Sequence, residues 1–358
     1  MRGTSMIDRR TILKSAAALG ILGVAPGGLV RSARAQNRPF TFCSFGGALS
    51  DTEKAAFMDP FSQANGAEIL NVSPTNYAKI KAMVEANAVE WDLVDVGGQF
   101  IYQGRDAGVL EPIDYSIVKA DHLEPYWKTE YGVYTSTGAS VLAFNTKAFP
   151  EGKEPQGWAD FWNVQDFPGA RSLYGRLYYN YEAALRAAGV AANEIYPATD
   201  EKVKMAMAKI AELKPNIAVW WTTGAQPPQL LSTGEVSMAL AWSGRINDAM
   251  REGSPVSMTF KDAIAWGNAY VVPKGTPYRE LAMQVISYAI TEEAQERLVP
   301  LGTYGPVLGS AAAKATPEQA KFMVTHPDNV KVEVIFNDEE VAKYWSKWEE
   351  EWQKFMLS

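Results

Sequence analysis

The order of apolar and polar positions predicts alternating strands and helices from residue 40 onward. Short apolar runs are typical of buried strands, and other segments repeat apolar residues at the spacing of one helix face. Strands that alternate with helices indicate a parallel sheet, so we expect an α/β fold. The predicted elements are strands at 40–45, 67–72 and 91–96, and helices after Leu49 and at 76–87, 177–189, 200–213 and 279–291.

Glycines and polar side chains follow the first and third predicted strands. Open α/β sheets bind ligands at the carboxyl ends of their strands, and glycine lets a ligand approach backbone N–H groups at a helix start. A plain tight turn would explain the glycine pair at 46–47 equally well. If this end of the sheet binds a ligand, the contacts are Ser44, Phe45, Gly46, Gly47, Ala48 and Gln99.

Two β-rich stretches predict crossings between two lobes. The first, at 131–144, carries small residues at its centre, where Ser136 to Gly138 permit backbone rotation. The second, at 266–273, returns the chain to the first lobe. We therefore predict lobe 1 at 37–139 plus about 268–312, and lobe 2 at 140–267 plus about 313–358, with the ligand cleft between them.

The stretch 217–250 is predicted to form one wall of that cleft. It places two polar turns, 220–224 and 242–245, at the ends of apolar segments. Trp220 and Trp221 are adjacent, so at most one of them faces a ligand. Predicted contacts from the two turns are Thr223, Trp242, Ser243 and Arg245.

Several of these side chains have a second interpretation. Arg245 could pair with Asp248 or Glu252 on its own helix, and such surface pairs contribute little to stability. Trp242 and Trp266 are predicted as apolar walls of the cleft, with a core position as the alternative. Three C-terminal tryptophans recur at helical spacing and are predicted to pack against the core: Trp345, Trp348 and Trp352.

Residues 1–36 are predicted to be a cleavable export signal. Paired arginines at 9–10 precede an apolar run at 15–25 that is too short to cross a bilayer, and Ala33-Arg34-Ala35 offers small residues for cleavage. The paired arginines are similar to the twin-arginine signal for export of folded proteins, and a general secretion signal is the alternative. Either one predicts a periplasmic or extracellular product.

Charge and motif content narrow the function classes. The leader holds six of the 34 Lys/Arg and one of the 41 Asp/Glu, which leaves 28 basic and 40 acidic residues and a net charge of −12. Nucleic acid and anionic membranes are therefore poor partners. The single Cys43 cannot form an intramolecular disulfide and is predicted to be buried. No metal-ligand or nucleophile motif is found, so we expect no cofactor, no metal and no catalytic residue, with a periplasmic hydrolase as a remote alternative.

Six motifs in a fixed order resemble the spermidine/putrescine-binding group of the periplasmic solute-binding proteins of ABC importers. They are SFGGALSDTEKAAFMDPF, WDLVDVGGQF, GVLEPIDYS, GWADFWNVQDFPG, GEVSMALAWSGR and AYVVPKGTP, which together span nearly all of the chain after the leader. The resemblance implies a two-lobed fold of the type II kind and hinge closure on the ligand. It also implies delivery to a membrane permease and a cap on the ligand from Tyr304. We expect a monomer.

The chain departs from polyamine binders at the positions that hold the cationic ligand. Where those proteins carry acids, this sequence has Arg245, Asn268 and, before Ala183, Arg176 and Tyr179. A cation buried without carboxylates is costly, whereas arginines favour a carboxylate by bidentate pairing. We therefore expect a carboxylate-bearing solute, such as an amino-acid derivative with a distal amine. A polyamine held by acids such as Asp95 is the alternative.

Overall fold

The computed structural model describes residues 38–302 and 304–358. The predicted signal peptide at 1–36 lies outside the described residues. Residues 39–358 form a single compact unit. In its first third, β1 lies between β2 and β3 and runs parallel to both, as the apolar periodicity predicts. The elements here are β1 (Phe40–Cys43), α1 (Gly47–Glu53), a π-helical turn (Lys54–Met58), α2 (Asp59–Asn65), β2 (Ile69–Val72), α3 (Tyr77–Glu85), β3 (Leu93–Gly97) and α4 (Gly98–Asp106).

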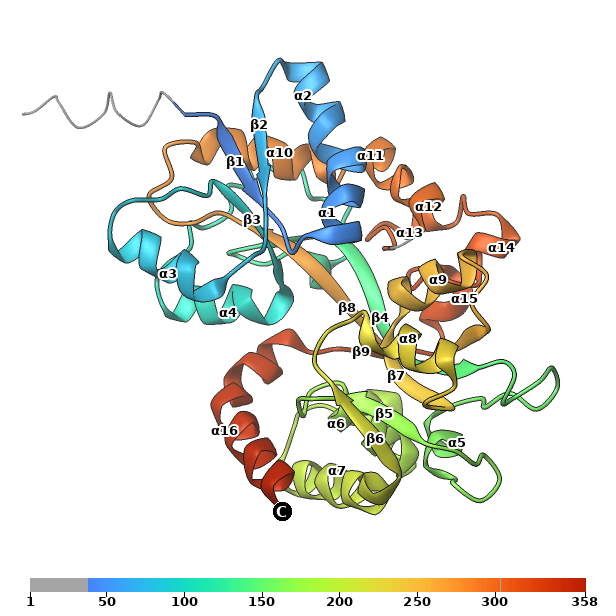
Figure 1. The fold of residues 1–358 in the computed structure, drawn as a ribbon. Coiled ribbons are helices and arrows are strands. Elements are labelled where there is room, and N and C mark those ends of the chain that lie inside the picture. The colour runs from blue at the N-terminus through green and yellow to red at the C-terminus, as the bar shows by residue number, and fades with distance from the viewer. Residues whose placement is uncertain (1–37, 303) are drawn as a thin grey trace, which may run out of the picture. The chain divides into compact units, whose positions relative to one another are not determined.

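Two long antiparallel strands, β4 (Val133–Asn145) and β8 (Val256–Val271), carry the chain between two groups of elements (Figure 1). β8 also pairs with β3, and β4 pairs with β7. The sheet is therefore continuous in the order β2-β1-β3-β8-β4-β7-β5-β6, with β9 beside β8. The predicted second crossing at 266–273 is only the later part of β8, which begins at Val256.

The second group of elements is another parallel unit, in which β5 lies between β6 and β7. The predicted helix at 200–213 has those bounds in the structure, because Thr199 accepts a hydrogen bond from the Lys202 N–H and caps its start. The elements are α5 (Trp158–Trp162), β5 (Arg171–Tyr174), α6 (Asn180–Ala187), α7 (Asp200–Leu213), β6 (Ile217–Trp221), α8 (Gln226–Thr233), β7 (Met238–Trp242) and α9 (Ser243–Arg251), with 3-10 turns at Pro125–Trp127, Ala192–Glu194 and Lys214–Asn216.

The last part of the chain is mostly helical and ends in a long helix that contacts α4. Asn337 caps this helix by accepting a hydrogen bond from the Glu340 N–H. The elements are α10 (Arg279–Ala289), α11 (Glu292–Glu296), α12 (Leu298–Leu301), α13 (Gly309–Ala312), α14 (Pro317–Ala320), α15 (Pro327–Val330), β9 (Val334–Ile335) and α16 (Asp338–Leu357).

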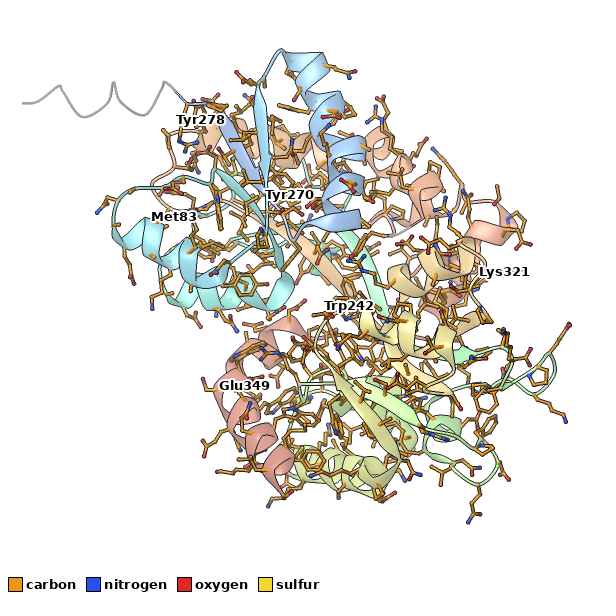
Figure 2. All side chains as sticks on the ribbon, viewed as in Figure 1. Met83, Trp242, Tyr270, Tyr278, Lys321 and Glu349 are labelled. Atoms are coloured by element: carbon orange, nitrogen blue, oxygen red, sulfur yellow. The ribbon has the colours of Figure 1, made fainter. Side chains whose placement is uncertain are left out.

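Three hydrophobic clusters form the core. One gathers buried side chains from 40–134 and 269–311, among them the predicted buried thiol of Cys43, which is confirmed as buried. The other two share β4: Leu142 and Phe144 join one cluster, and Val141 and Ala143 join the other. This division follows from the alternation of strand side chains between two faces of a sheet. Figure 2 shows Trp242 between the side chains around Tyr270 and those around Glu349. Within the described residues, no helix has the length and apolarity needed to cross a membrane.

The pairing of the two long strands depends on a glycine. Gly138 of β4 is the register partner of Trp266 of β8, and a Cβ added at Gly138 would lie 2.6 Å from the indole of Trp266. We predict that Gly138→Ala lowers the free energy of unfolding by about 1–3 kcal/mol, because the indole must move to admit the methyl group. Urea denaturation would measure the change. As a control, Gly309→Ala in α13 should be nearly neutral, because the nearest atom to its added Cβ is 4.0 Å away. Equal stabilities of the two variants would contradict the argument.

Candidate ligand-binding cavity

A cavity of about 660 Å³ lies where the ends of β3 and β7 meet the middle of β8. Its wall combines aromatic, amide and charged side chains from segments that are far apart in the sequence. The wall consists of Phe45, Gly46, Leu49, Thr75, Asn76, Tyr77, Ala78, Gly97, Gln99, Tyr174, Arg176, Tyr178, Tyr179, Trp242, Arg245, Trp266, Gly267, Asn268, Tyr304, Asp338 and Trp345.

The cavity brings together many of the ligand contacts that the sequence predicts. Those in its wall are Phe45, Gly46, Gln99, Arg176, Tyr179, Trp242, Arg245, Trp266, Asn268 and Tyr304. The remaining predicted contacts, Ser44, Gly47, Ala48, Thr223 and Ser243, lie outside the wall of this cavity. Which of these side chains contact a ligand stays a prediction.

Trp266 is the centre of the aromatic part of the wall. Its ring lies 6.3 Å from Trp242 and 6.4 Å from both Tyr179 and Tyr304, measured between ring centroids. The indole N–H of Trp266 donates to the Ser140 hydroxyl at 3.2 Å, which fixes the plane of the ring. This arrangement offers large apolar faces at small cost in side-chain entropy.

Tyr179 has an unusual backbone for a bulky residue. Its φ is 68°, in the left-handed region that L side chains rarely adopt. Its ring packs against Tyr178 at 4.8 Å and Phe336 at 4.9 Å, so packing holds the conformation in place. Backbone strain of this kind concentrates at ligand sites, and here it directs a phenol ring into the cavity wall.

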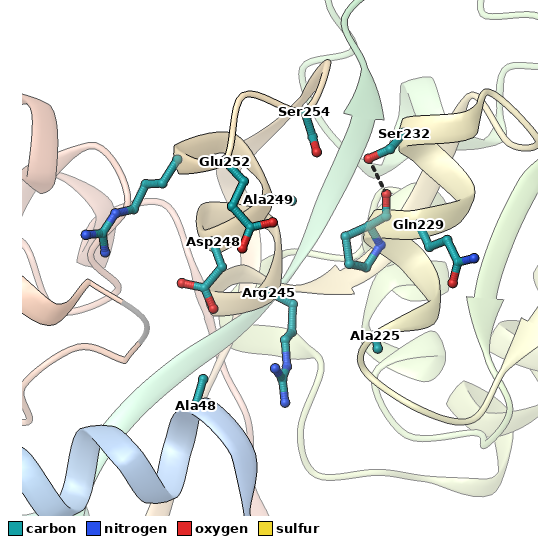
Figure 3. A pocket seen from close by; sticks show the side chains of 11 residues that line it. Ala48, Ala225, Gln229, Ser232, Arg245, Asp248, Ala249, Glu252 and Ser254 are labelled. Carbon is teal, nitrogen blue, oxygen red and sulfur yellow. Dashed lines mark hydrogen bonds between the residues drawn. The ribbon is translucent and has the colours of Figure 1, made fainter.

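Arg245, the predicted partner of an anionic ligand group, lies in the cavity wall. It is the third residue of α9, and the first turn of this helix contains no acid. The helix dipole disfavours an arginine at this end of a helix. Figure 3 shows its side chain projecting away from Asp248 and Glu252, into the space between Ala48 and Ala225. Within residues 38–302 and 304–358, Arg245 forms no ion pair, so the alternative of pairing on its own helix is not observed.

Two N–H groups in the cavity wall lack a hydrogen-bond partner within the described part of the chain. They are the indole N–H of Trp242 and the Nε–H of Arg245, and both are buried. An unpaired buried donor costs about 1–3 kcal/mol, which a ligand acceptor would recover. Trp242 occupies the N-cap position of α9 without a side-chain cap, so the N-terminal end of this helix adjoins the cavity wall. The combination favours a negatively charged ligand group.

Arg176 contributes less free charge than Arg245. Its guanidinium pairs with Glu349 at 2.8 Å and lies over the ring of Trp345, 5.7 Å from the centroid. Trp345 packs against the core as predicted, and it also belongs to the cavity wall. Trp348 and Trp352 are buried as predicted. The C-terminal helix α16 therefore supplies part of both the core and the cavity wall.

Asp338, the first residue of α16, is the one carboxylate among the residues of the wall. The Tyr134 hydroxyl donates to its Oδ2 at 2.7 Å. Burial raises the pKa of this carboxyl to about 7, although hydrogen bonds from Tyr134 and from the Gln99 backbone act in the opposite direction. Gly98 makes this contact possible, since a Cβ there would lie 2.2 Å from the Tyr134 hydroxyl.

Asp95, the acid proposed for a polyamine, does not reach the cavity. It is fully buried and lies near Glu53, and burial raises the pKa of both carboxyls. Ser44 is held by the same group, because its hydroxyl donates to Glu53. The Ser44 side chain is therefore buried against Glu53 and does not line the cavity.

Of the other predicted contacts outside the wall, Ser243 and Thr223 form hydrogen bonds within the protein, and Ala48 and Gly47 lie near Arg245. Ser243 accepts a hydrogen bond from the Ala139 N–H at 3.1 Å, which links α9 to β4. The Thr223 N–H donates to the Gln226 side chain at 3.1 Å. Ala48 lines a neighbouring cavity of about 730 Å³, which shares Arg245 with the first (Figure 3). Gly47 faces Arg245, with 3.9 Å between an added Cβ and Nη2. Neither Trp220 nor Trp221 lines the cavity.

Sequence reasoning missed several wall residues. Asp338 carries the clearest signal, because Asn337-Asp338-Glu339 is a typical helix start, yet nothing in the sequence shows that this start meets α4. Tyr77 and Tyr178 are predicted only as members of helices, and Tyr174 lies in no predicted element. No group of three or more His, Cys, Asp or Glu side chains in the described residues could hold a metal ion.

Comparison with known proteins places this architecture in a family. Residues 56–325 match the family model described as bacterial extracellular solute-binding protein. A gamma-aminobutyric acid-binding protein of Pseudomonas aeruginosa is 35% identical over 317 residues, which cover 87% of this chain and 88% of that protein. The spermidine/putrescine-binding periplasmic protein 1 of Haemophilus influenzae is 25% identical over 276 residues, covering 73% of this chain and 74% of that protein.

Solved structures agree with the sequence relatives. An ABC transporter substrate-binding protein from Bradyrhizobium japonicum has a TM-score of 0.84 and 33% identity, and the match covers 89% of this chain and 100% of that one. A structure described as the Atu4243-GABA receptor has a TM-score of 0.79 and 32% identity, covering 89% and 97% of the two chains. The predicted two-lobed α/β fold is confirmed. The chain therefore belongs to the bacterial extracellular solute-binding proteins and is the solute-binding component of an ABC transporter.

Proposed function

We propose that the protein binds a small zwitterionic solute, with gamma-aminobutyric acid (GABA) as the first candidate. The observation that carries the proposal is the pair of opposite charges in one aromatic cavity: Arg245, which has no ion-pair partner among the described residues, and Asp338. Arg245 would take the carboxylate, with the Trp242 indole N–H as a second donor. Asp338 would take the ammonium, among rings that favour cations. Two relatives with GABA in their printed names support this choice.

A polyamine fits this cavity less well. A diamine is best held by an acid at each end, and Asp338 is the single carboxylate in the wall, since Asp95 is fully buried and does not line the cavity. Its second ammonium would meet Arg245 instead, and like charges in a desolvated site repel. The weaker sequence similarity to a spermidine/putrescine-binding protein points the same way.

The cellular role follows from the family and from the sequence. We propose that residues 1–36 direct export to the periplasm, where the protein acts as a monomer, closes on its solute and delivers it to a membrane permease. The role is binding without turnover. A sensory receptor could use the same closed form. Incubation of GABA with the purified protein should leave the GABA chemically unchanged, whereas its consumption would support a hydrolase.

We predict that Arg245→Met weakens GABA binding at least about a hundredfold, because a buried carboxylate loses a charged, bidentate partner. Isothermal titration calorimetry would measure the dissociation constants. Arg251→Met is the matched control: Arg251 lies on the same helix, outside the cavity, and donates to the Leu301 carbonyl. Its affinity should equal that of the parent protein. Tight putrescine or spermidine binding that survives Arg245→Met would overturn the zwitterion proposal.

GABA binding should also depend on pH through Asp338. The carboxyl must lose its proton to pair with an ammonium, and its pKa is about 7 in the unliganded protein. Affinity is therefore full above this pKa and should fall about tenfold per pH unit below it. GABA itself keeps both charges between about pH 5 and 9, because its groups resemble those of Glu and Lys.

Calorimetry at several pH values would test this dependence. Asp338→Asn keeps an acceptor for the Tyr134 hydroxyl but has no proton to lose. We expect this variant to bind GABA weakly and with a flat pH profile. An unchanged slope in the variant would assign the pH dependence to another group.

A further inference from the structure

A smaller cavity of about 330 Å³, called the second cavity below, adjoins the wall of the ligand cavity and differs from the 730 Å³ cavity beside Ala48. The second cavity and the ligand cavity share Trp266, Gly267 and Asp338. Phe336, which lines the second cavity, packs against Tyr178 and Tyr179 of the first, at 6.2 and 4.9 Å between ring centroids. A layer of aromatic side chains and one carboxylate therefore separates two concave spaces.

Aromatic rings line the second cavity from its rim to Asp338. Tyr126, half exposed at the rim, has its ring 4.7 Å from Trp127, and Trp127 lies 5.4 Å from Tyr134. Tyr134 then donates to Asp338 at 2.7 Å. The rings present electron-rich faces, and the run ends at a carboxylate. A small organic cation is the chemical class that both features attract.

Asp338 is the one carboxylate, and Lys128 the one ammonium, among the side chains that line this space. Lys128 keeps its positive charge while its ammonium donates to the Ala120 carbonyl at 2.8 Å. Burial raises the pKa of the Tyr126 phenol, and the nearby charges of Glu124 and Glu333 raise it further. Glu333 is not part of the lining, and burial raises the pKa of its carboxyl to about 8. A cation in this space is therefore attracted mainly by the rings and by Asp338.

We propose that this second cavity, formed by the run Tyr126–Trp127, Tyr134, Phe336 and Asp338, is a binding site for a small alkylammonium ion. The site shares Trp266, Gly267 and Asp338 with the solute cavity, and it does not require that GABA be the solute. Its charge selectivity comes from Asp338, and its shape selectivity comes from the rings. A neutral molecule of the same shape would lack the attraction to both.

Choline and its uncharged carbon isostere, 3,3-dimethyl-1-butanol, test the proposal because they differ in charge at nearly equal shape. Each would be titrated calorimetrically into the full-length protein at pH 8, with sodium chloride matched to the choline chloride. We expect choline to bind at least about tenfold more tightly than the isostere, the range of a desolvated cation over aromatic faces. Equal binding of both, or no saturable choline binding, would overturn the proposal.

Two tyrosine variants locate the site. Tyr126 lines the second cavity and not the ligand cavity, whereas Tyr304 lines the ligand cavity and not the second cavity. Tyr126→Ala should weaken choline binding about fivefold or more, while Tyr304→Ala should leave it unchanged. The reverse result would place choline in the solute cavity and refute the second site.

Discussion

The antiparallel pairing of β4 with β8 is the constraint on which the rest of this structure depends. These strands join two parallel units into one sheet, and the ligand cavity lies at their crossing. Close pairing requires Gly138 opposite Trp266, and that contact fixes the indole at the centre of the aromatic wall. The strands that connect the units thus also place the main recognition surface. Any motion of one unit against the other must act on the wall itself.

Two other arginines of this region, Arg171 and Arg176, have partners within the protein, whereas Arg245 has none among the described residues. Arg171, which is fully buried, satisfies its guanidinium with backbone carbonyls of Phe161, Phe167 and Gly169, and Arg176 is paired with Glu349. Arg245 has neither kind of partner in the described residues, although it stands at a helix start that does not favour it. This unpaired charge in the cavity wall is the feature on which the proposed carboxylate contact rests.

The one carboxylate in the wall of the ligand cavity comes from the far end of the chain. Asp338 begins α16, and the same helix contributes Trp345 to the wall of the ligand cavity. Its position depends on Gly98, which leaves room for the hydrogen bond from Tyr134. Since Asp338 borders both cavities, its charge is available to ligands on either side of the aromatic layer.

The sequence by itself determined most of the elements, because local apolar spacing and capping residues set where strands and helices begin and end. The helix at 200–213, for example, begins after its cap Thr199. The positions of Gln99, Trp242 and Arg245 at strand ends followed from where the apolar runs stop. The sequence also determined the family, through motifs in a fixed order. Only the tertiary structure decided that Ser44 turns into the core towards Glu53 and that Asp95 stays buried, since a strand's two faces look alike until the sheet is covered. It alone brought Asp338 to the cavity, because packing of α16 on α4 joins residues more than two hundred positions apart, and no local pattern encodes that contact.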